Sequence, residues 1–386
     1  MRLSDPFFVL VALILHQGVQ GQVVDPYAEE APANPVQDTA DEPVRESFSL
    51  EAATGYLDRR AHLAESRCYA CHSTFTYLPA RSLIDPLAPE VMRTRLMLER
   101  FLTKLHTPAE AAAVKTMHIP RVRLLAAVEL ARHDAATTGR LAPVTRQALD
   151  HLWKLQTSSG GIDWIHVKEA PQAIDDWWPA AMMALGVAAA PEGYASTEAA
   201  KAGLEKLRTW FRAHPPQTRH EQALTLLADS AIGGILDDPQ RNRCIESIRS
   251  GQHEDGGWSM TDLAPWHRRD QKPLDPDQSD GYATALCVYA LVRAGVDRDD
   301  PGLRKGIDWL KGNQRETGGW YTQSPFSRDK LASNTGTSFA IQALAACGEL
   351  PPPPVVTAEA LASARERAAA ELPADQYLPG AEGSVP

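Results

Sequence analysis

Two cysteines and a histidine lie close together in the segment CYACH, at residues 68–72. Covalent attachment of haem c needs two thiols at this spacing for the two vinyl groups, and a histidine directly after them to bind the iron. Cys68, Cys71 and His72 meet this requirement. The sequence therefore predicts a haem c attached through Cys68 and Cys71, with His72 as an axial ligand of the iron.

Two other interpretations of this segment stay open from the sequence alone. A disulfide between Cys68 and Cys71 is common chemistry in exported proteins. A zinc site would need further ligands besides these three residues. Because the chain has no second close pair of cysteines, the candidates are His62 and His106. If haem is bound, the candidates for its sixth ligand are Met92, Met97, Met117 and His118.

The start of the chain is typical of a secretory signal. Arg2 supplies a positive charge, residues 7–15 form an apolar stretch too short to span a bilayer, and Val19 and Gly21 are small residues before a cleavage site. We therefore expect a signal peptide at residues 1–21, a periplasmic or secreted protein, and no transmembrane span after cleavage. An oxidising compartment suits both haem attachment and a disulfide.

Composition limits the classes of partner. Hydrophobic residues make up 44% of the 386 residues and charged residues 23%, which is ordinary for a globular protein with a sizeable core. The formal net charge is −10 and the sequence has no basic stripe, so a nucleic-acid partner is excluded. Cys244, Cys287 and Cys347 fall on apolar helical stretches, and we interpret them as buried hydrophobic residues.

Repeated pairs of helices must position these residues. The segments RNRCIESIRSGQHEDGGW (241–258) and LRKGIDWLKGNQRETGGW (303–320) share an amphipathic helix, a Gln and a terminal Gly-Gly-Trp, and residues 145–164 form a looser copy. A second helix with few charges and many alanines follows each copy, so we expect it to be buried and the first helix to lie outside. This alternation, at about fifty residues per repeat, predicts stacked helical hairpins. Periodicity alone leaves open whether the stack closes into a ring.

The repeated loop resembles the QW repeat of squalene cyclases and their prenyltransferase relatives. Residues 252–258 and 314–320 match it well, and residues 156–164 match it loosely. In that family the Gln bonds to backbone at the end of a neighbouring outer helix, and the Trp packs over it. The resemblance covers about residues 150–348 and implies an all-α fold: an α/α toroid, here of about five helical hairpins, with inner helices around a central cavity.

Three carboxylates stand at the starts of expected inner helices, Asp175, Asp176 and Asp280. Squalene-type cyclases protonate an alkene with an Asp of a D-x-D-D motif, which burial and its neighbours must keep protonated. In a closed ring these three side chains would face the mouth of the cavity, which makes them candidate catalytic acids. Each is also suited to cap its helix. The letters of the motif itself occur at residues 297–300, but they precede the proline of an outer helix and are interpreted as its N-cap.

The expected domain organisation follows from these segments. We predict a signal peptide at 1–21, a disordered linker at 22–47, the toroid at 48–348 and a Pro/Ala-rich tail at 349–386. Within the toroid, residues 48–140 are expected to form the first hairpin and 141–348 the QW-type repeats. In this register the CYACH segment replaces a connecting loop at the rim of the ring. Such loops are exposed and often carry functional residues.

The main functional hypothesis is an exported toroid with covalent haem c, used in electron transfer or haem-dependent ligand binding. Its partner would be a redox protein or a small apolar ligand in the central cavity. One alternative is a terpenoid (squalene/hopene-type) cyclase-like or prenyltransferase-like enzyme. Another is a haem-free binding scaffold whose CxxC segment forms a disulfide.

Overall fold

The computed structural model describes residues 38–65, 76–104, 119–162, 164, 171–172, 174–268, 270–325 and 329–372. All of them belong to the unit Val36–Pro386. Within this described part, the regular structure is helical, with two isolated bridges and no strand. The all-α class predicted from the helical repeats is therefore confirmed.

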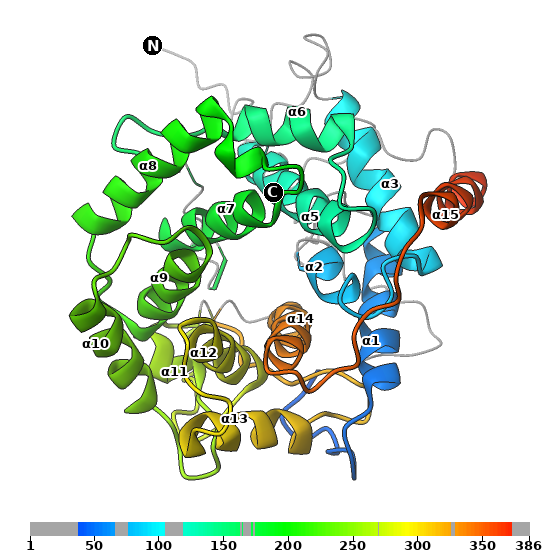
Figure 1. Cartoon of the computed structure of the whole chain (residues 1–386). Coiled ribbons are helices and arrows are strands. Elements are labelled where there is room, and N and C mark those ends of the chain that lie inside the picture. Colours follow the sequence, from blue (N-terminus) through cyan, green and yellow to red (C-terminus); the bar gives the residue numbers. More distant parts are fainter. Residues whose placement is uncertain are drawn as a thin grey trace, which may run out of the picture. The chain divides into compact units, whose positions relative to one another are not determined.

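The helices of this unit alternate between an outer and an inner layer (Figure 1). The outer layer contains α1 (Leu50–Glu65), α3 (Pro89–Lys104), α6 (Pro143–Leu152), α8 (Glu198–Ala213), α10 (Asp238–Arg249) and α13 (Pro301–Gly312). The inner layer contains α2 (Tyr77–Arg81), α5 (Ile119–Ala136), α7 (Trp177–Ala189), α9 (Arg219–Ile232), α12 (Gly281–Arg293) and α14 (Asp329–Ala346). Each inner helix contacts the next, and α14 contacts α2. The inner layer is therefore a closed ring, the α/α toroid expected from the resemblance.

Sequence patterning decides which layer a helix joins. In α8 the buried residues recur three or four positions apart, from Ala200 through Leu204 and Leu207 to Phe211, and the charged residues take the other face. In α12 every residue from Gly281 to Leu291 is buried. A helix with a charged face must border water, whereas one that is apolar all round is stable only between neighbours.

Three loops of the same design connect outer to inner helices. The Nε2 amide groups of Gln156, Gln252 and Gln314 donate to carbonyl oxygens on the next outer helix or just before it, at 2.7, 2.8 and 2.9 Å. The third of these bonds joins the end of α13 to Ser49, directly before α1, and so closes the ring. Gly318 in this loop has φ +98°, and a Cβ there would overlap the Ala52 carbonyl, so only glycine fits.

The region 48–140 contains two hairpins where the sequence predicted one. The short helix α2 and the outer helix α3 lie between α1 and α5, so the described helices pair into six hairpins rather than about five. The physical reason is length: α2 has five residues, too few to show a helical period.

The predicted disordered linker at 22–47 is too long, because residues 38–47 belong to the folded unit. Asp38 is buried, accepts a hydrogen bond from the Tyr56 hydroxyl at 2.8 Å and pairs with Arg60. Val44 forms a backbone bridge with Arg315. This segment therefore supports the closure of the ring.

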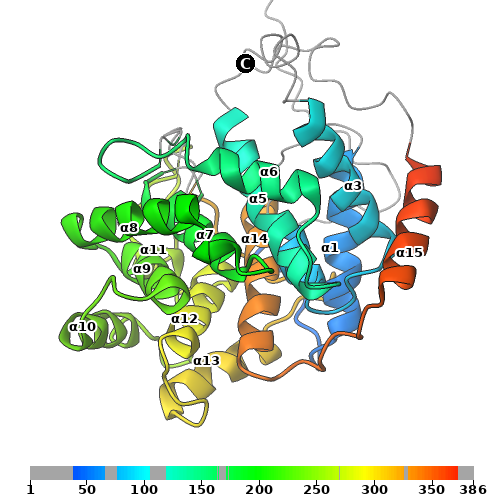
Figure 2. The same ribbon diagram turned by 45° about the horizontal axis from the view of Figure 1, so that its top comes forward.

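The predicted tail carries helix α15 (Ala358–Glu371), which packs along the outer face of α3 (Figure 2). Its apolar residues form a small cluster with Met92, Leu96 and Met97 of α3. Arg365 of α15 pairs with Glu99 of α3 at 2.7 Å. Met92 and Met97, which were candidates for a sixth haem ligand, are therefore used in packing between these two helices.

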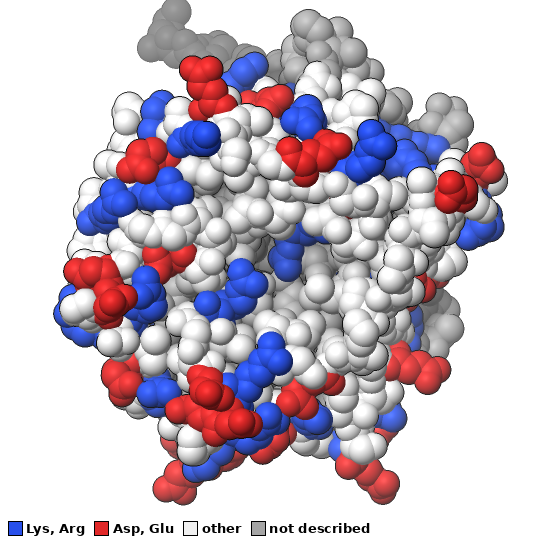
Figure 3. Space-filling model, viewed as in Figure 1, with Lys and Arg blue, Asp and Glu red and all other residues white. Residues whose placement is uncertain are grey.

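One face of the toroid is hollowed at its centre (Figure 3). On this face most charged side chains lie over the outer helices, toward the periphery. A few basic side chains lie at the edge of the hollow. In the described part of the chain, no helix is long and apolar enough to span a membrane.

Candidate functional site

The predicted haem residues Cys68, Cys71 and His72 lie outside the described residues, between the end of α1 and the start of α2. Met117 and His118 also lie outside them. Among the residues that the structure describes, no group of three or more His, Cys, Asp or Glu side chains is arranged to hold a metal ion. Cys244, Cys287 and Cys347 are free and buried, as predicted.

The carboxylates predicted at inner-helix starts do lie there. The Oδ1 atom of Asp175 accepts hydrogen bonds from the backbone N–H groups of Trp177 and Trp178, at 3.0 and 3.1 Å, and so caps α7. Asp176 is next to it in sequence, but its side chain makes no capping bond. The Oδ1 atom of Asp280 accepts from the Ala283 N–H at 3.1 Å and caps α12. The capping role that the sequence left open therefore applies to Asp175 and Asp280.

Asp175 belongs to a chain of polar contacts that joins three inner helices. Its Oδ2 atom lies 3.2 Å from His220 Nδ1, and His220 Nε2 lies 3.1 Å from the Tyr282 hydroxyl. His220 is in the first turn of α9 and Tyr282 in the first turn of α12, and both are fully buried. The ring of Trp266 contacts His220 edge-on, with 4.9 Å between the ring centroids. This chain of contacts is called the Asp–His–Tyr relay below.

Sequence reasoning missed His220 and Tyr282. The available signal was position, because both residues occupy the first turn of an expected inner helix, as the candidate carboxylates do. Thr218 and Glu221 form a capping box that fixes the start of α9, and the letters T-x-x-E show it in the sequence. What the sequence does not show is that the starts of α7, α9 and α12 meet.

The environment of Asp175 favours its ionised form. Burial acts to raise the pKa of this carboxyl, but the hydrogen bond from His220 and the N–H groups of Trp178 and Trp177 outweigh it, so its pKa is lowered. An ionised Asp175 can only accept a hydrogen bond, so the Nδ1–H group of His220 donates to it. In the neutral imidazole with this tautomer, Nε2 is an acceptor, and the Tyr282 hydroxyl donates to it.

Asp280 has the opposite character. It is fully buried, and besides capping α12 it accepts the Met260 N–H through Oδ2 at 2.7 Å. Burial raises its pKa to about 8, against the lowering effect of the backbone N–H groups, and the negative charge of Asp262 raises it further. Asp280 is therefore a neutral carboxylic acid near pH 7, already surrounded by donors that can stabilise its anion.

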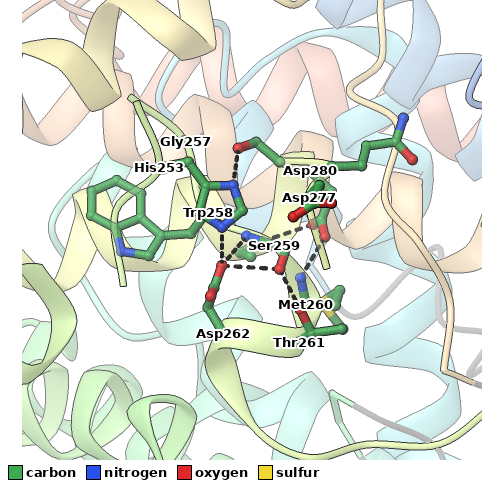
Figure 4. A network of polar contacts seen from close by, with 12 residues as sticks. His253, Gly257, Trp258, Ser259, Met260, Thr261, Asp262, Asp277 and Asp280 are labelled. Carbon is green, nitrogen blue, oxygen red and sulfur yellow. Dashed lines mark hydrogen bonds and ion pairs between the residues drawn. The ribbon is translucent and has the colours of Figure 1, made fainter. Parts of the chain in front are cut away.

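A polar network lies beside Asp280 (Figure 4). Asp262 Oδ2 accepts from the Ser259 N–H at 2.7 Å and lies 2.9 Å from His253 Nε2. His253 Nδ1 is 3.1 Å from the Ser279 hydroxyl. These contacts hold the loop between α10 and α12 against the start of α12, through the short helix α11 (Met260–Leu263).

The four residues 277–280 read Asp-Gln-Ser-Asp. They differ from the D-x-D-D pattern only at Ser279, whose hydroxyl donates to Asp255 Oδ1 at 2.9 Å. Of the two aspartates in this stretch, Asp280 is buried at the inner-helix start, whereas Asp277 is exposed. A D-x-D-D-like stretch therefore occurs here, away from the letters at 297–300, where Asp300 caps α13 through the Leu303 N–H at 3.0 Å.

Asp280 and the Asp–His–Tyr relay meet at Tyr282. Burial raises the pKa of Tyr282 well above its usual range, and the negative charge of Asp175 adds to the effect. Tyr282 therefore stays a neutral hydroxyl with a carboxylate-based relay on one side and a carboxylic acid on the other. The arrangement can supply a proton from Asp280 and pass another through Tyr282.

Residues 220–325 match the family model of the squalene-hopene cyclase C-terminal domain. The matched segment contains His220, Asp280 and Tyr282. The chain is 32% identical over 107 residues to squalene–hopene cyclase of Bradyrhizobium diazoefficiens, which is 27% of this chain and 16% of that protein. A probable squalene–hopene cyclase of Sinorhizobium fredii matches to the same extent.

Solved structures match over a larger part of the chain. A glycosidase has a TM-score of 0.51 and 13% identity, covering 79% of this chain and 100% of that chain. The type II terpene cyclase MstE from Scytonema has a TM-score of 0.46 and 15% identity, covering 78% of this chain and 100% of that chain. The glycosidase likeness shows the fold alone. With the family match, the fold is squalene cyclase-like.

Proposed function

We propose that this protein is a terpenoid cyclase-like enzyme that holds an acyclic polyprenyl chain within the toroid and protonates one of its alkenes with Asp280. The observation that carries the proposal is the state of Asp280, a fully buried carboxyl with a pKa of about 8 at the start of an inner helix. Protonating an unactivated alkene requires a carboxylic acid that stays neutral at working pH and gives up its proton only to the substrate.

The surroundings of Asp280 support the step that follows proton transfer. The O–H bond of the acid breaks, a C–H bond forms on the alkene, and a carboxylate and a carbocation result. The N–H groups of Ala283 and Met260 already point at the two carboxyl oxygens, and the N-terminus of α12 favours a negative charge. Donors that are in place before the charge develops lower the barrier without reorganisation.

The inner helices supply a suitable environment for a cation. Phe339 of α14 packs edge-on against Tyr282, with 5.3 Å between ring centroids. Both rings are buried. Aromatic faces attract cations, and the effect is stronger where water is excluded.

The test is incubation of the full chain with squalene and with geranylgeraniol in D₂O, followed by mass spectrometry of the products. We expect cyclised products that carry one deuterium from the exchanged Asp280 carboxyl. Asp280→Asn should lower turnover by at least ~100-fold, since a general acid contributes this much. The matched control is Asp300→Asn, which changes a helix cap outside the site and should leave turnover unchanged. Absence of cyclised product with folded protein, or full activity of Asp280→Asn, would refute the proposal.

As a second candidate function, we propose that the exported protein carries haem c on Cys68 and Cys71, with His72 on the iron, and exchanges electrons with a redox partner. The support is the CxxCH spacing together with the signal-like start of the chain. These residues lie outside the described part of the chain.

Expression in a host with cytochrome c maturation tests this second candidate through intact mass and the Soret band. We expect a mass gain of one haem that is lost when both cysteines are replaced by alanine. A mass loss of two protons would instead indicate the Cys68–Cys71 disulfide. Wild-type protein with neither change, purified from a competent host, contradicts haem attachment.

A further inference from the structure

The two aspartates at the starts of α7 and α12 have environments that push their protonation states apart. Asp280 has no exposed surface and a negative neighbour in Asp262, whereas Asp175 accepts a hydrogen bond from His220. Two titratable groups in one site with opposed protonation states mark an acid and a base. The proposed function uses the acid and leaves the base without a role.

We propose that Tyr282, His220 and Asp175 form the base that removes the closing proton, so that the reaction ends in an alkene rather than in a water-derived alcohol. This inference rests on the proposed function and adds to it the product class and the residues that decide it. It follows from the direction of the hydrogen bonds in the relay and from the exclusion of water around it.

The hydrogen bonds of the relay are oriented to accept a proton. With Asp175 ionised and His220 neutral, the Nδ1–H of His220 donates to Asp175 and its Nε2 accepts the Tyr282 O–H. No donor among the described residues reaches the Tyr282 oxygen, so its lone pairs are open to a proton while its own proton already points at a base. A phenol in this arrangement can take a proton on oxygen as it passes its own proton on, without forming a tyrosinate.

The closing step converts the cation into a neutral alkene. A C–H bond next to the cationic carbon breaks, and its electron pair forms the C=C bond that neutralises the cation. The proton moves to the Tyr282 oxygen while the Tyr282 proton moves to His220 Nε2, giving an imidazolium beside the Asp175 carboxylate. Asp175 keeps 16% of its side chain exposed, so the proton can leave there to solvent. Asp280 regains one proton from solvent, and no net proton or water is consumed.

Packing keeps water from His220 and Tyr282, the inner two residues of the relay, and leaves only Asp175 partly exposed. His220 and Tyr282 are fully buried, with Trp266 edge-on against His220 and Phe339 edge-on against Tyr282. A carbocation formed here has a hydroxyl acceptor close by and no water to trap it. Loss of the relay should therefore divert the cation toward slower quenching by any water that enters.

The test compares Tyr282→Phe and His220→Gln with Tyr289→Phe, in H₂¹⁸O, with the same polyprenes. Tyr289 is the matched control because it lies two turns further along α12, packs against the same Phe339, and has no place in the relay. The measurements are the ratio of alkene to ¹⁸O-labelled alcohol, the turnover rate, and the melting temperature as a check of folding.

We expect wild type and Tyr289→Phe to give alkene. Tyr282→Phe and His220→Gln should turn over ~10- to 100-fold more slowly and give mostly labelled alcohol. An alcohol product from wild type, or folded Tyr282→Phe and His220→Gln with unchanged product and rate, overturns this inference while the proposed function stands. Absence of cyclised product from wild type overturns both.

Discussion

The starts of α7 and α12 make an instructive comparison. Both have an aspartate that accepts backbone N–H groups of the helix that follows, and both segments have the sequence signal of a helix cap. Yet Asp175 has a lowered pKa and Asp280 has a pKa near 8. The difference arises from other segments: α9 supplies His220 to Asp175, whereas α11 supplies Asp262 to a fully buried Asp280. The local sequence therefore places the capping aspartate, and residues distant in the sequence determine its protonation state.

The largest expected effect that separates the two aspartates is the pH dependence of stability at Asp280. Its pKa rises from 3.8 to about 8 on folding. The folded state then holds a proton that the unfolded state has released, so this group stabilises the fold below about pH 4, and the benefit is lost as pH rises toward 8. The change amounts to at most about 6 kcal/mol.

Chemical denaturation between pH 5 and 8.5 measures this effect. Asp280→Asn does not titrate, so its unfolding free energy should fall less steeply with pH than that of wild type. Asp300→Asn, at the partly exposed cap of α13, should follow the wild-type slope. Parallel curves for wild type and Asp280→Asn would show that Asp280 is ionised in the folded protein.

A smaller effect is expected at the other aspartate. His220→Gln removes the imidazole hydrogen bond that lowers the pKa of Asp175, so this pKa should rise. Asp175 stabilises the fold above its unfolded pKa, and this benefit is lost as pH falls through its lower folded pKa. The variant should lose about 1–3 kcal/mol at pH 7 and begin its acid unfolding at a higher pH.

Acid titration followed by circular dichroism checks this prediction. His267→Gln serves as the control, because His267 is exposed and lies one residue after Trp266. Equal acid midpoints for wild type and His220→Gln would mean that the contact with His220 does not hold Asp175 in its ionised form.

The smallest expected effect is the loss of unfolding free energy when the N-cap of α9, the helix that contains His220, is removed. Thr218→Ala removes the side-chain cap of α9 and should lower the unfolding free energy by about 1 kcal/mol. Thr209→Ala, on the exposed face of outer helix α8, should change it by less than ~0.5 kcal/mol. Thermal unfolding of both variants against wild type measures the difference, and equal losses would show that the cap does not position α9.

Much of the fold was predictable from local pattern. Amphipathic and apolar helices alternate because each must bury a different share of its surface, and the Gln-to-Gly-Gly loops identify where an outer helix turns inward. The hairpin of α1 and α2 was not predictable in this way, because five residues show no period. Ring closure was not either, since it depends on a bond between Gln314 and Ser49, 265 positions apart.

In the candidate site, too, some features were predictable from the sequence and others depended on the tertiary structure. The sequence alone determined that Asp175 and Asp280 stand at helix starts, because capping is a contact between a side chain and the next turn of its own chain. Only the tertiary structure decided that His220 and Tyr282 join Asp175, and that Asp280 is sealed from water beside Asp262. Contacts of this kind depend on which helix starts meet in the closed ring, and burial changes a pKa only after the whole ring has excluded water.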